Sequence, residues 1–229
     1  MNQRLKIGVS SCLLGERVRY DGELKRSALI ADDMAHFFDF IPVCPEVEAG
    51  FPVPRPPVQL VGDQLAPRVV EVGNSQIDIT ERLDTFSRQR VVELEEVCGY
   101  LFKARSPSCG PDIPLFDLSG REVGRTKGIF SRSVQHHFPL LPVEDEGGME
   151  NSANGGWFLF GVLLFACWQG TDVGDESDLS PAELWRSWVD ALYPGVQWSP
   201  QIVSMLGSQW KRPEEAGQLL RGAGRGGVI

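Results

Sequence analysis

The sequence predicts an α/β fold: a Rossmann-like, mostly parallel sheet with flanking helices, plus a small helical C-terminal extension. Short apolar stretches that resemble buried strands alternate with longer stretches in which apolar residues recur at helical spacing. Three of the predicted strands lead into a cysteine with a glycine or proline close by. The composition, 42% hydrophobic and 23% charged, is ordinary for a globular chain with a sizeable core.

The elements of the first part follow in order from these patterns. Residues 5–10 are predicted as a central strand, and apolar residues at helical spacing predict a helix over 27–39. A second strand is expected at 41–44. The proline-rich segment 52–57 cannot form a helix or the interior of a regular strand. We therefore interpret it as a stiff, extended wall of a site, which carries Arg55.

The rest of the main domain combines hairpins, helices and strands. If the sheet is parallel, the cysteines at the strand ends share one edge, where open α/β folds bind ligands. The predicted elements are a hairpin of 58–60 with 69–72, a helix from Asp78 or Thr80 to Val97, a strand at 100–102, a short hairpin at 115–118, a helix over 128–137 and a last parallel strand at 140–143.

The character of the chain changes near residue 150, so we predict two parts, a domain of residues 1–150 and a helical extension of residues 151–229. The extension is expected to close the sheet with an apolar helix. Its predicted elements are a buried helix over 157–168, a helix from the Ser180–Glu183 capping box to about Tyr193, a short helix from Ser199 and a disordered glycine-rich tail from Arg221.

Bulk properties exclude several classes of function. The net charge of −9 argues against a broad nucleic-acid-binding surface, which would show excess lysine and arginine. The longest apolar run spans 12 residues, against roughly 20 for a membrane span, and the first residues do not resemble a secretory signal. We therefore expect a cytoplasmic protein without membrane association. In a reducing compartment, five cysteines indicate metal binding or catalysis rather than disulfides.

Three cysteines carry the main functional signal. Cys12, Cys44 and Cys109 each follow a predicted strand, and the chain has no CxxC pair that would indicate a zinc ribbon. Three thiolates fit an iron–sulfur cluster that leaves one iron open as a Lewis acid. Cys98 and Cys167 fall inside predicted helices, so we interpret them as small buried hydrophobic residues.

Polar residues beside these cysteines are candidates for chemistry. Glu46, two residues after a cysteine, could act as a general acid or base, or it could favour the start of a helix. Ser106 and Ser108 could orient water or a substrate oxygen, or cap a turn. Lys103 and Arg105 alternate along the chain, so one of them is expected to face the site.

The loop of residues 12–26 is rich in arginine and includes Asp21. It could be a solvated surface loop. Alternatively, it contacts an anion or a substrate beside Cys12. The first interpretation gives these charges no function, whereas the second makes Asp21 a candidate substrate-binding residue.

Several of these motifs together resemble the thiouracil desulfidase family. The resemblance covers about residues 5–146, and the motifs occur in the expected order. They are Val9–Gly15 with Tyr20-Asp21-Gly22, Pro42–Glu46, Gly50–Arg55, Ser106–Gly110 and Leu141–Glu144.

The resemblance implies a desulfidase in which Cys12, Cys44 and Cys109 hold a 4Fe-4S cluster and the open iron takes the sulfur of a thiolated pyrimidine. It implies that Glu46 and Ser106 are catalytic and that water replaces sulfur, giving uracil and sulfide. The substrate would be a small thiopyrimidine base, a nucleoside, or thiouridine in tRNA. Further candidate substrate-binding residues are Ser108, Lys103, Arg55 and Asp21.

Two other functions are compatible with the residues alone. In the first, the protein is a nucleotide- or RNA-binding module with structural cysteines, and Arg55, Arg125 and Lys127 belong to the binding surface. In the second, the same three cysteines hold zinc in a hydrolase. Metal analysis would separate both from the cluster enzyme.

Overall fold

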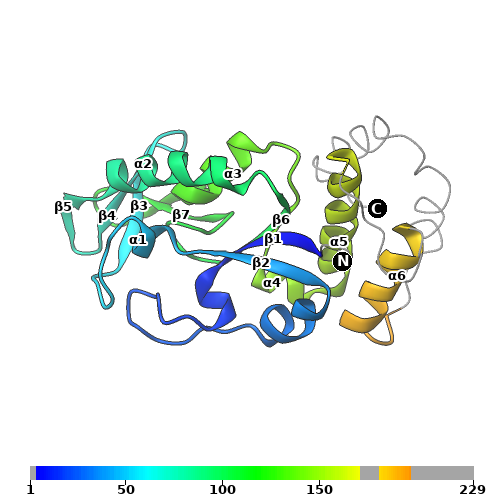
Figure 1. Ribbon diagram of the computed structural model, residues 1–229. Coiled ribbons are helices and arrows are strands. Elements are labelled where there is room, and N and C mark those ends of the chain that lie inside the picture. The colour runs from blue at the N-terminus through cyan, green and yellow to red at the C-terminus, as the bar shows by residue number, and fades with distance from the viewer. Residues whose placement is uncertain (1–3, 171–180, 197–229) are drawn as a thin grey trace.

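The computed structural model describes residues 4–170 and 181–196, which form two sheets flanked by helices (Figure 1). The first sheet has the strand order β2-β1-β6-β9, and all its pairings are parallel. This confirms the predicted parallel sheet with a central first strand. Its strands are β1 (Leu5–Ser10), β2 (Phe38–Val43), β6 (Val97–Phe102) and β9 (Val143–Asp145).

The second sheet has the order β5-β4-β3-β7-β8, with β3 parallel to β7 and the other pairs antiparallel. Both predicted hairpins are present, but their pairing into one sheet was not predicted. All five residues of β5 are exposed, so no hydrophobic alternation indicates that strand. The strands are β3 (Val58–Gly62), β4 (Pro67–Glu71), β5 (Asn74–Asp78), β7 (Ile113–Phe116) and β8 (Glu122–Thr126).

Helices cover both sheets, and Figure 1 shows α5 and α6 at the end of the molecule opposite β5. None of the helices in the described ranges is long and apolar enough to cross a membrane. The α-helices are α1 (Pro45–Glu48), α2 (Thr80–Val91), α3 (Ile129–His137), α4 (Glu146–Glu150), α5 (Ser152–Trp168) and α6 (Pro181–Leu192). Shorter turns are η1 (Ser11–Leu14), η2 (Leu29–Asp33), η3 (Met34–His36) and η4 (Val92–Leu94).

Two predicted helices have the wrong extent. The helix expected over 27–39 is a π turn followed by a 3-10 turn, because β2 already begins at Phe38 and pairs with β1. The long helix expected to reach Val97 ends as an α-helix at Val91. Val97 and Cys98 instead begin β6, so the prediction of a helical Cys98 was wrong. A short apolar run does not distinguish a buried strand from a buried helix.

The last parallel strand is also shifted. It was expected at 140–143 but spans Val143–Asp145, and α4 starts directly after it at Glu146. Register explains the shift, because Tyr100 and Phe102 of β6 pair with Val143 and Asp145. Glu144 and Asp145 therefore belong to the strand, and Glu146 begins α4.

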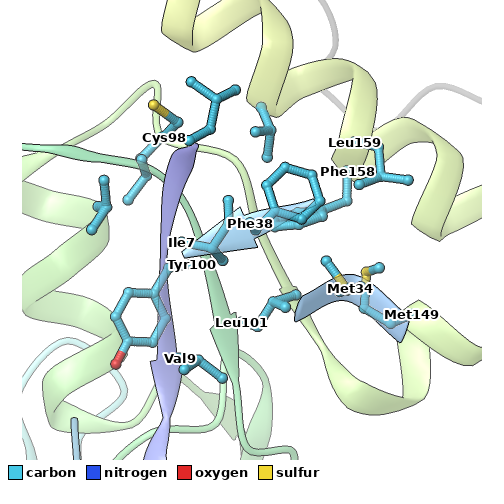
Figure 2. Packing of buried hydrophobic residues seen from close by; sticks show 14 of the residues in the cluster. Ile7, Val9, Met34, Phe38, Cys98, Tyr100, Leu101, Met149, Phe158 and Leu159 are labelled. Atoms are coloured by element: carbon cyan, nitrogen blue, oxygen red, sulfur yellow. The ribbon is translucent and has the colours of Figure 1, made fainter. Parts of the chain in front are cut away.

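The strands β1 and β6 are buried between helices on both faces. On one face Tyr100 and Phe102 stack with ring centroids 4.3 Å apart, and Phe130 of α3 meets Tyr100 edge-on at 5.8 Å. On the other face α5 packs so closely on Gly99 that an added Cβ would lie 2.8 Å from Val162. Figure 2 shows Tyr100 on one side of β1 and the side chains of α5 on the other. Because both faces of β1 and β6 are buried, the sequences of these strands are nearly continuous apolar runs.

The helices after residue 150 pack on the first sheet, α5 against β6 and α6 against β2. Phe38 of β2 contacts Trp188 of α6, with ring centroids 4.6 Å apart. The Tyr193 hydroxyl donates to the Met149 carbonyl at 2.7 Å. Gly155 in α5 permits this contact, because an added Cβ would lie 1.7 Å from the Tyr193 oxygen. The predicted cap at Ser180, the helix from Ser199 and the tail from Arg221 lie outside the described residues.

Gly155→Ala should therefore destabilise the fold, although alanine favours a helix over glycine by about 1 kcal/mol. The methyl group would displace Tyr193 and α6, and we expect the free energy of unfolding to fall by about 1–3 kcal/mol. Urea denaturation measures this change. The control is Gly124→Ala, where nothing lies within 4 Å of an added Cβ. A Gly155→Ala protein as stable as the wild type would contradict this packing.

Candidate active site

A pocket of about 610 Å³ lies where the carboxyl edge of the first sheet faces the second sheet. Cys12, Cys44 and Cys109 all line it, together with Glu46 and Ser106. The opposite wall includes residues of β3 and β7 from the second sheet. The pocket thus gathers the three cysteines that the sequence singled out and both residues that were expected to be catalytic.

Strand order brings the three cysteines together. Cys12 lies in the 3-10 turn after β1, and Cys44 is the residue before α1, directly after β2. Cys109 lies in the loop that follows β6. Because β2, β1 and β6 are parallel neighbours, their carboxyl ends share one edge. Proline at the first position of α1 fixes the turn that presents Cys44.

Burial and mutual proximity determine the protonation of these thiols. Burial raises the pKa of Cys12 to about 11, against a lowering effect from Lys103. Burial also raises the pKa of Cys44, and it raises the pKa of Cys109 well above its usual value. The negative charges that Cys44 and Cys12 would carry raise the pKa of Cys109 further. The three thiols are therefore electrostatically coupled.

The remaining two cysteines lie elsewhere. Cys98 is 1% exposed at the start of β6, and Cys167 is half-buried near the end of α5. Burial raises the pKa of each thiol to about 11. Neither residue lines the pocket, in agreement with their interpretation as structural residues.

The N-terminus of α3 holds the loop that carries Cys109. The amide of Phe130 donates to the Ser108 carbonyl at 2.9 Å. Gly128 allows this approach, because a Cβ there would lie 2.6 Å from the Ser108 carbonyl oxygen. The Ser106 hydroxyl accepts from the amide of Cys109 at 3.1 Å. Ser106 therefore caps the turn and also lines the pocket.

Glu46 is held between a cation and a hydroxyl. Arg55 Nε donates to Glu46 Oε2 at 2.6 Å, and the two side chains are only 8% and 12% exposed. Ser108 Oγ donates to Glu46 Oε1 at 2.7 Å. Ser108 itself is 1% exposed, so it orients Glu46 instead of forming the pocket wall. Each carboxylate oxygen keeps a lone pair for a further donor.

Arg55 connects the proline-rich wall to the cysteine loops. Its guanidinium donates to the carbonyls of Val18 at 3.0 Å and Pro52 at 3.1 Å, and its amide donates to Tyr20 at 2.8 Å. The Cys44 thiol also donates to the Val18 carbonyl, at 3.8 Å. Arg55 and Pro57 of the proline-rich segment line the pocket.

Both Lys103 and Arg105 line the pocket, so the expectation that only one of them faces the site was wrong. In an extended chain, residues two positions apart lie on the same face, so alternation does not separate them. The Lys103 ammonium forms an ion pair with Glu146, whose other oxygen accepts from the Ala104 amide at 2.7 Å. The Lys103 amide donates to Ser10 Oγ at 2.9 Å. Glu146 and Ser10 were not predicted as partners of Lys103, because both are distant from it in the chain.

Asp21 forms an ion pair with Arg19 at the edge of the pocket. Its carboxylate accepts from Arg19 Nε at 3.0 Å and from Nη2 at 2.6 Å, and this pairing lowers the pKa of Asp21 to about 2. Arg19 lines the pocket and Asp21 does not. Asp21 therefore orients an arginine that the sequence analysis did not single out.

Comparison with known proteins agrees with this geometry. The family model described as 2-thiouracil desulfurase matches residues 7–146, more than half of the chain. The chain belongs to the 2-thiouracil desulfurase family. The match covers all the candidate residues and ends at Glu146, just before the helical extension.

A solved structure is also similar to this chain. It is a [4Fe-4S]-dependent thiouracil desulfidase, 29% identical, with a TM-score of 0.50; the match covers 64% of this chain and 94% of that one. A search of curated proteins gave no match. The α/β fold that places the pocket is thus shared with that thiouracil desulfidase.

Arg55→Met should expose the dependence of the site on its buried ion pair. The Glu46 carboxylate would stay buried without its cation, and we expect the free energy of unfolding to fall by about 3–5 kcal/mol. Arg186→Met, which breaks an exposed pair with Asp190, should cost less than about 1 kcal/mol. Urea denaturation of both variants measures the difference. Equal losses would show that burial of the Glu46 pair is unimportant.

Proposed function

We propose that the protein is an iron–sulfur-dependent desulfidase that removes sulfur from a thiolated pyrimidine and yields uracil and sulfide. The observation that carries the proposal is the gathering of three thiols, two buried and one half-buried, and a paired carboxylate in one pocket. Family membership and the similar [4Fe-4S]-dependent thiouracil desulfidase support it. Thiouracil base, its nucleoside and thiouridine in tRNA are the candidate substrates.

The residues present fit a 4Fe-4S cluster held by Cys12, Cys44 and Cys109. Soft thiolates are the ligands that iron–sulfur clusters take, and three of them leave one iron open. Among the described residues, no group of three His, Cys, Asp or Glu could hold a single metal ion. A four-iron cluster does not need that arrangement, because each cysteine binds a different iron. When bound, the cluster would supply a Lewis acid for the substrate sulfur.

Glu46 would move the protons of the reaction. Arg55 and Ser108 fix both of its oxygens, so a remaining lone pair can accept from a water molecule in the pocket. As a general base Glu46 would activate the water that replaces sulfur, and as an acid it would protonate the ring. The buried position of the pair keeps this carboxylate in one orientation.

Ser106 would position the water or the base. Its oxygen already accepts from the amide of Cys109, so its own hydrogen can donate toward the pocket. Lys103 and Arg19 would orient the polar edge of the pyrimidine, because both line the pocket and are held by Glu146 and Asp21.

The proposal is tested by the iron and acid-labile sulfide content of anaerobically purified protein, followed by sulfide release from each candidate substrate. We expect about four irons per chain and release of sulfide from at least one thiopyrimidine. Cys44→Ala should lose both iron and turnover, because one of the three ligands is gone. Cys167→Ala, outside the pocket, should keep both. A wild-type protein that stays free of iron after reconstitution would refute the proposal.

Glu46→Gln should separate cluster binding from turnover. The amide keeps the size of the side chain but cannot accept a proton, so we expect the wild-type visible spectrum and iron content with turnover reduced about 100-fold or more. Stopped assays of sulfide release measure the rate. Glu81→Gln, an exposed carboxylate of α2 that does not line the pocket, is the control. Unchanged turnover in Glu46→Gln would remove Glu46 from the mechanism.

A further inference from the structure

One buried hydroxyl has no hydrogen-bond partner. Across residues 4–170 and 181–196, Tyr100 Oη is the only buried side-chain nitrogen or oxygen without one. Tyr100 is 0% exposed, so bulk water does not reach it. An unsatisfied buried donor is costly and rare in folded proteins. Its presence in the middle of the central sheet therefore calls for an acceptor that the chain itself does not provide.

Packing directs this hydroxyl toward the cysteines. The ring lies over Gly8 of β1, where an added Cβ would be 2.3 Å from Tyr100 Cδ2. Figure 2 shows the hydroxyl at the Val9 end of β1, the end that leads to Cys12. Ser10, two residues after Gly8 and hence on the same face, lines the pocket together with Cys12 and Cys109. The phenol thus lies beneath the edge that carries the cysteines.

Several ionisable groups lie near the Tyr100 hydroxyl and affect its pKa. Burial raises the pKa of Tyr100 well above its usual value, so the group remains a hydroxyl that can donate. The charges that Cys109, Glu48 and Cys44 would carry raise this pKa further, and the charge of Arg90 lowers it. Glu48 is already engaged, since its oxygens accept from the Cys44 amide at 2.7 Å and from Arg90 at 3.2 Å. Neither Glu48 nor a cysteine sulfur accepts from Tyr100 Oη in the described structure, so the acceptor would come from a group bound at the cysteine site.

We propose that the Tyr100 hydroxyl donates a hydrogen bond to sulfur at the cysteine site, on the side of Cys109 and Cys44, and thereby raises the reduction potential of the bound cluster. The inference rests on the proposed function, because it requires the cluster. A hydrogen bond to sulfur stabilises the more negative, reduced state, and such bonds are among the features that set cluster potentials. Tyr100 is then a positioning residue that does not touch the substrate.

Tyr100→Phe removes only the hydroxyl, so it tests the inference directly. We expect wild-type iron content and a reduction potential that is more negative, by roughly tenfold in the reduction equilibrium or about 59 mV for one electron. Potentiometric titration of the reconstituted protein, followed by EPR, gives the value. Tyr193→Phe is the matched control, because its hydroxyl donates to Met149 instead and should leave the potential unchanged.

Fluorination tests the same bond in the opposite direction. The chain has three tyrosines, and 3-fluorotyrosine is a stronger hydrogen-bond donor than tyrosine. The fluorinated wild-type protein should have a higher potential, and Tyr20→Phe and Tyr193→Phe should show the same increase on fluorination, which assigns the increase to Tyr100. This measurement keeps the inference testable if Tyr100→Phe does not assemble a cluster.

The outcomes separate the two proposals. If the wild-type protein holds iron but neither Tyr100→Phe nor fluorination changes the potential, the role of Tyr100 is wrong and the desulfidase proposal stands. If the wild-type protein holds no iron after reconstitution, the proposed function fails, and the role of Tyr100 fails with it.

Discussion

Parallel hydrogen bonding of β1 with both β2 and β6 is what makes one site from three distant segments. Each of these strands runs toward the same edge, and each leads into a cysteine that lines the pocket. The pairing register matters, because a shift of one residue would turn the side chains of a strand to the other face of the sheet. Glycine residues on both faces keep that register: Gly8 admits the Tyr100 ring, and Gly99 admits α5. The helices that cover the sheet therefore also fix the position of the cysteines.

The charged residues of the pocket depend on the same frame. Glu46 is paired with Arg55, and Lys103 with Glu146, with all four side chains at most 19% exposed. A buried pair gains little net stability, because desolvation offsets the attraction between the charges. Loss of one partner, however, leaves an uncompensated charge. Such pairs are thus better understood as devices that fix the direction of a side chain, and here each pair holds a residue against the pocket.

Sequence reasoning recovered the parts of the site that are local in the chain. A cysteine after an apolar strand, or four prolines in a short segment, can be identified from neighbouring residues alone, and these predictions agree with the sheet edge and the Arg55 wall. Partners across long separations were missed, such as Glu146 for Lys103 and Ser108 for Glu46. Predicted element boundaries were wrong where an apolar run was compatible with either a strand or a helix, as at Cys98. The strand β5 was missed because none of its residues is buried.

Burial makes two features at the carboxyl edge of the first sheet unfavourable for the chain alone. The pKa values of three thiols are raised by burial, and the Tyr100 hydroxyl has no acceptor within the described residues. Each cost would fall in the presence of a group that binds thiolates and offers sulfur as an acceptor. Any group that binds the folded chain and not the unfolded one adds its binding free energy to stability. Tyr100 would therefore favour an occupant that offers sulfur, because a ligand that lacks sulfur leaves its hydroxyl unsatisfied.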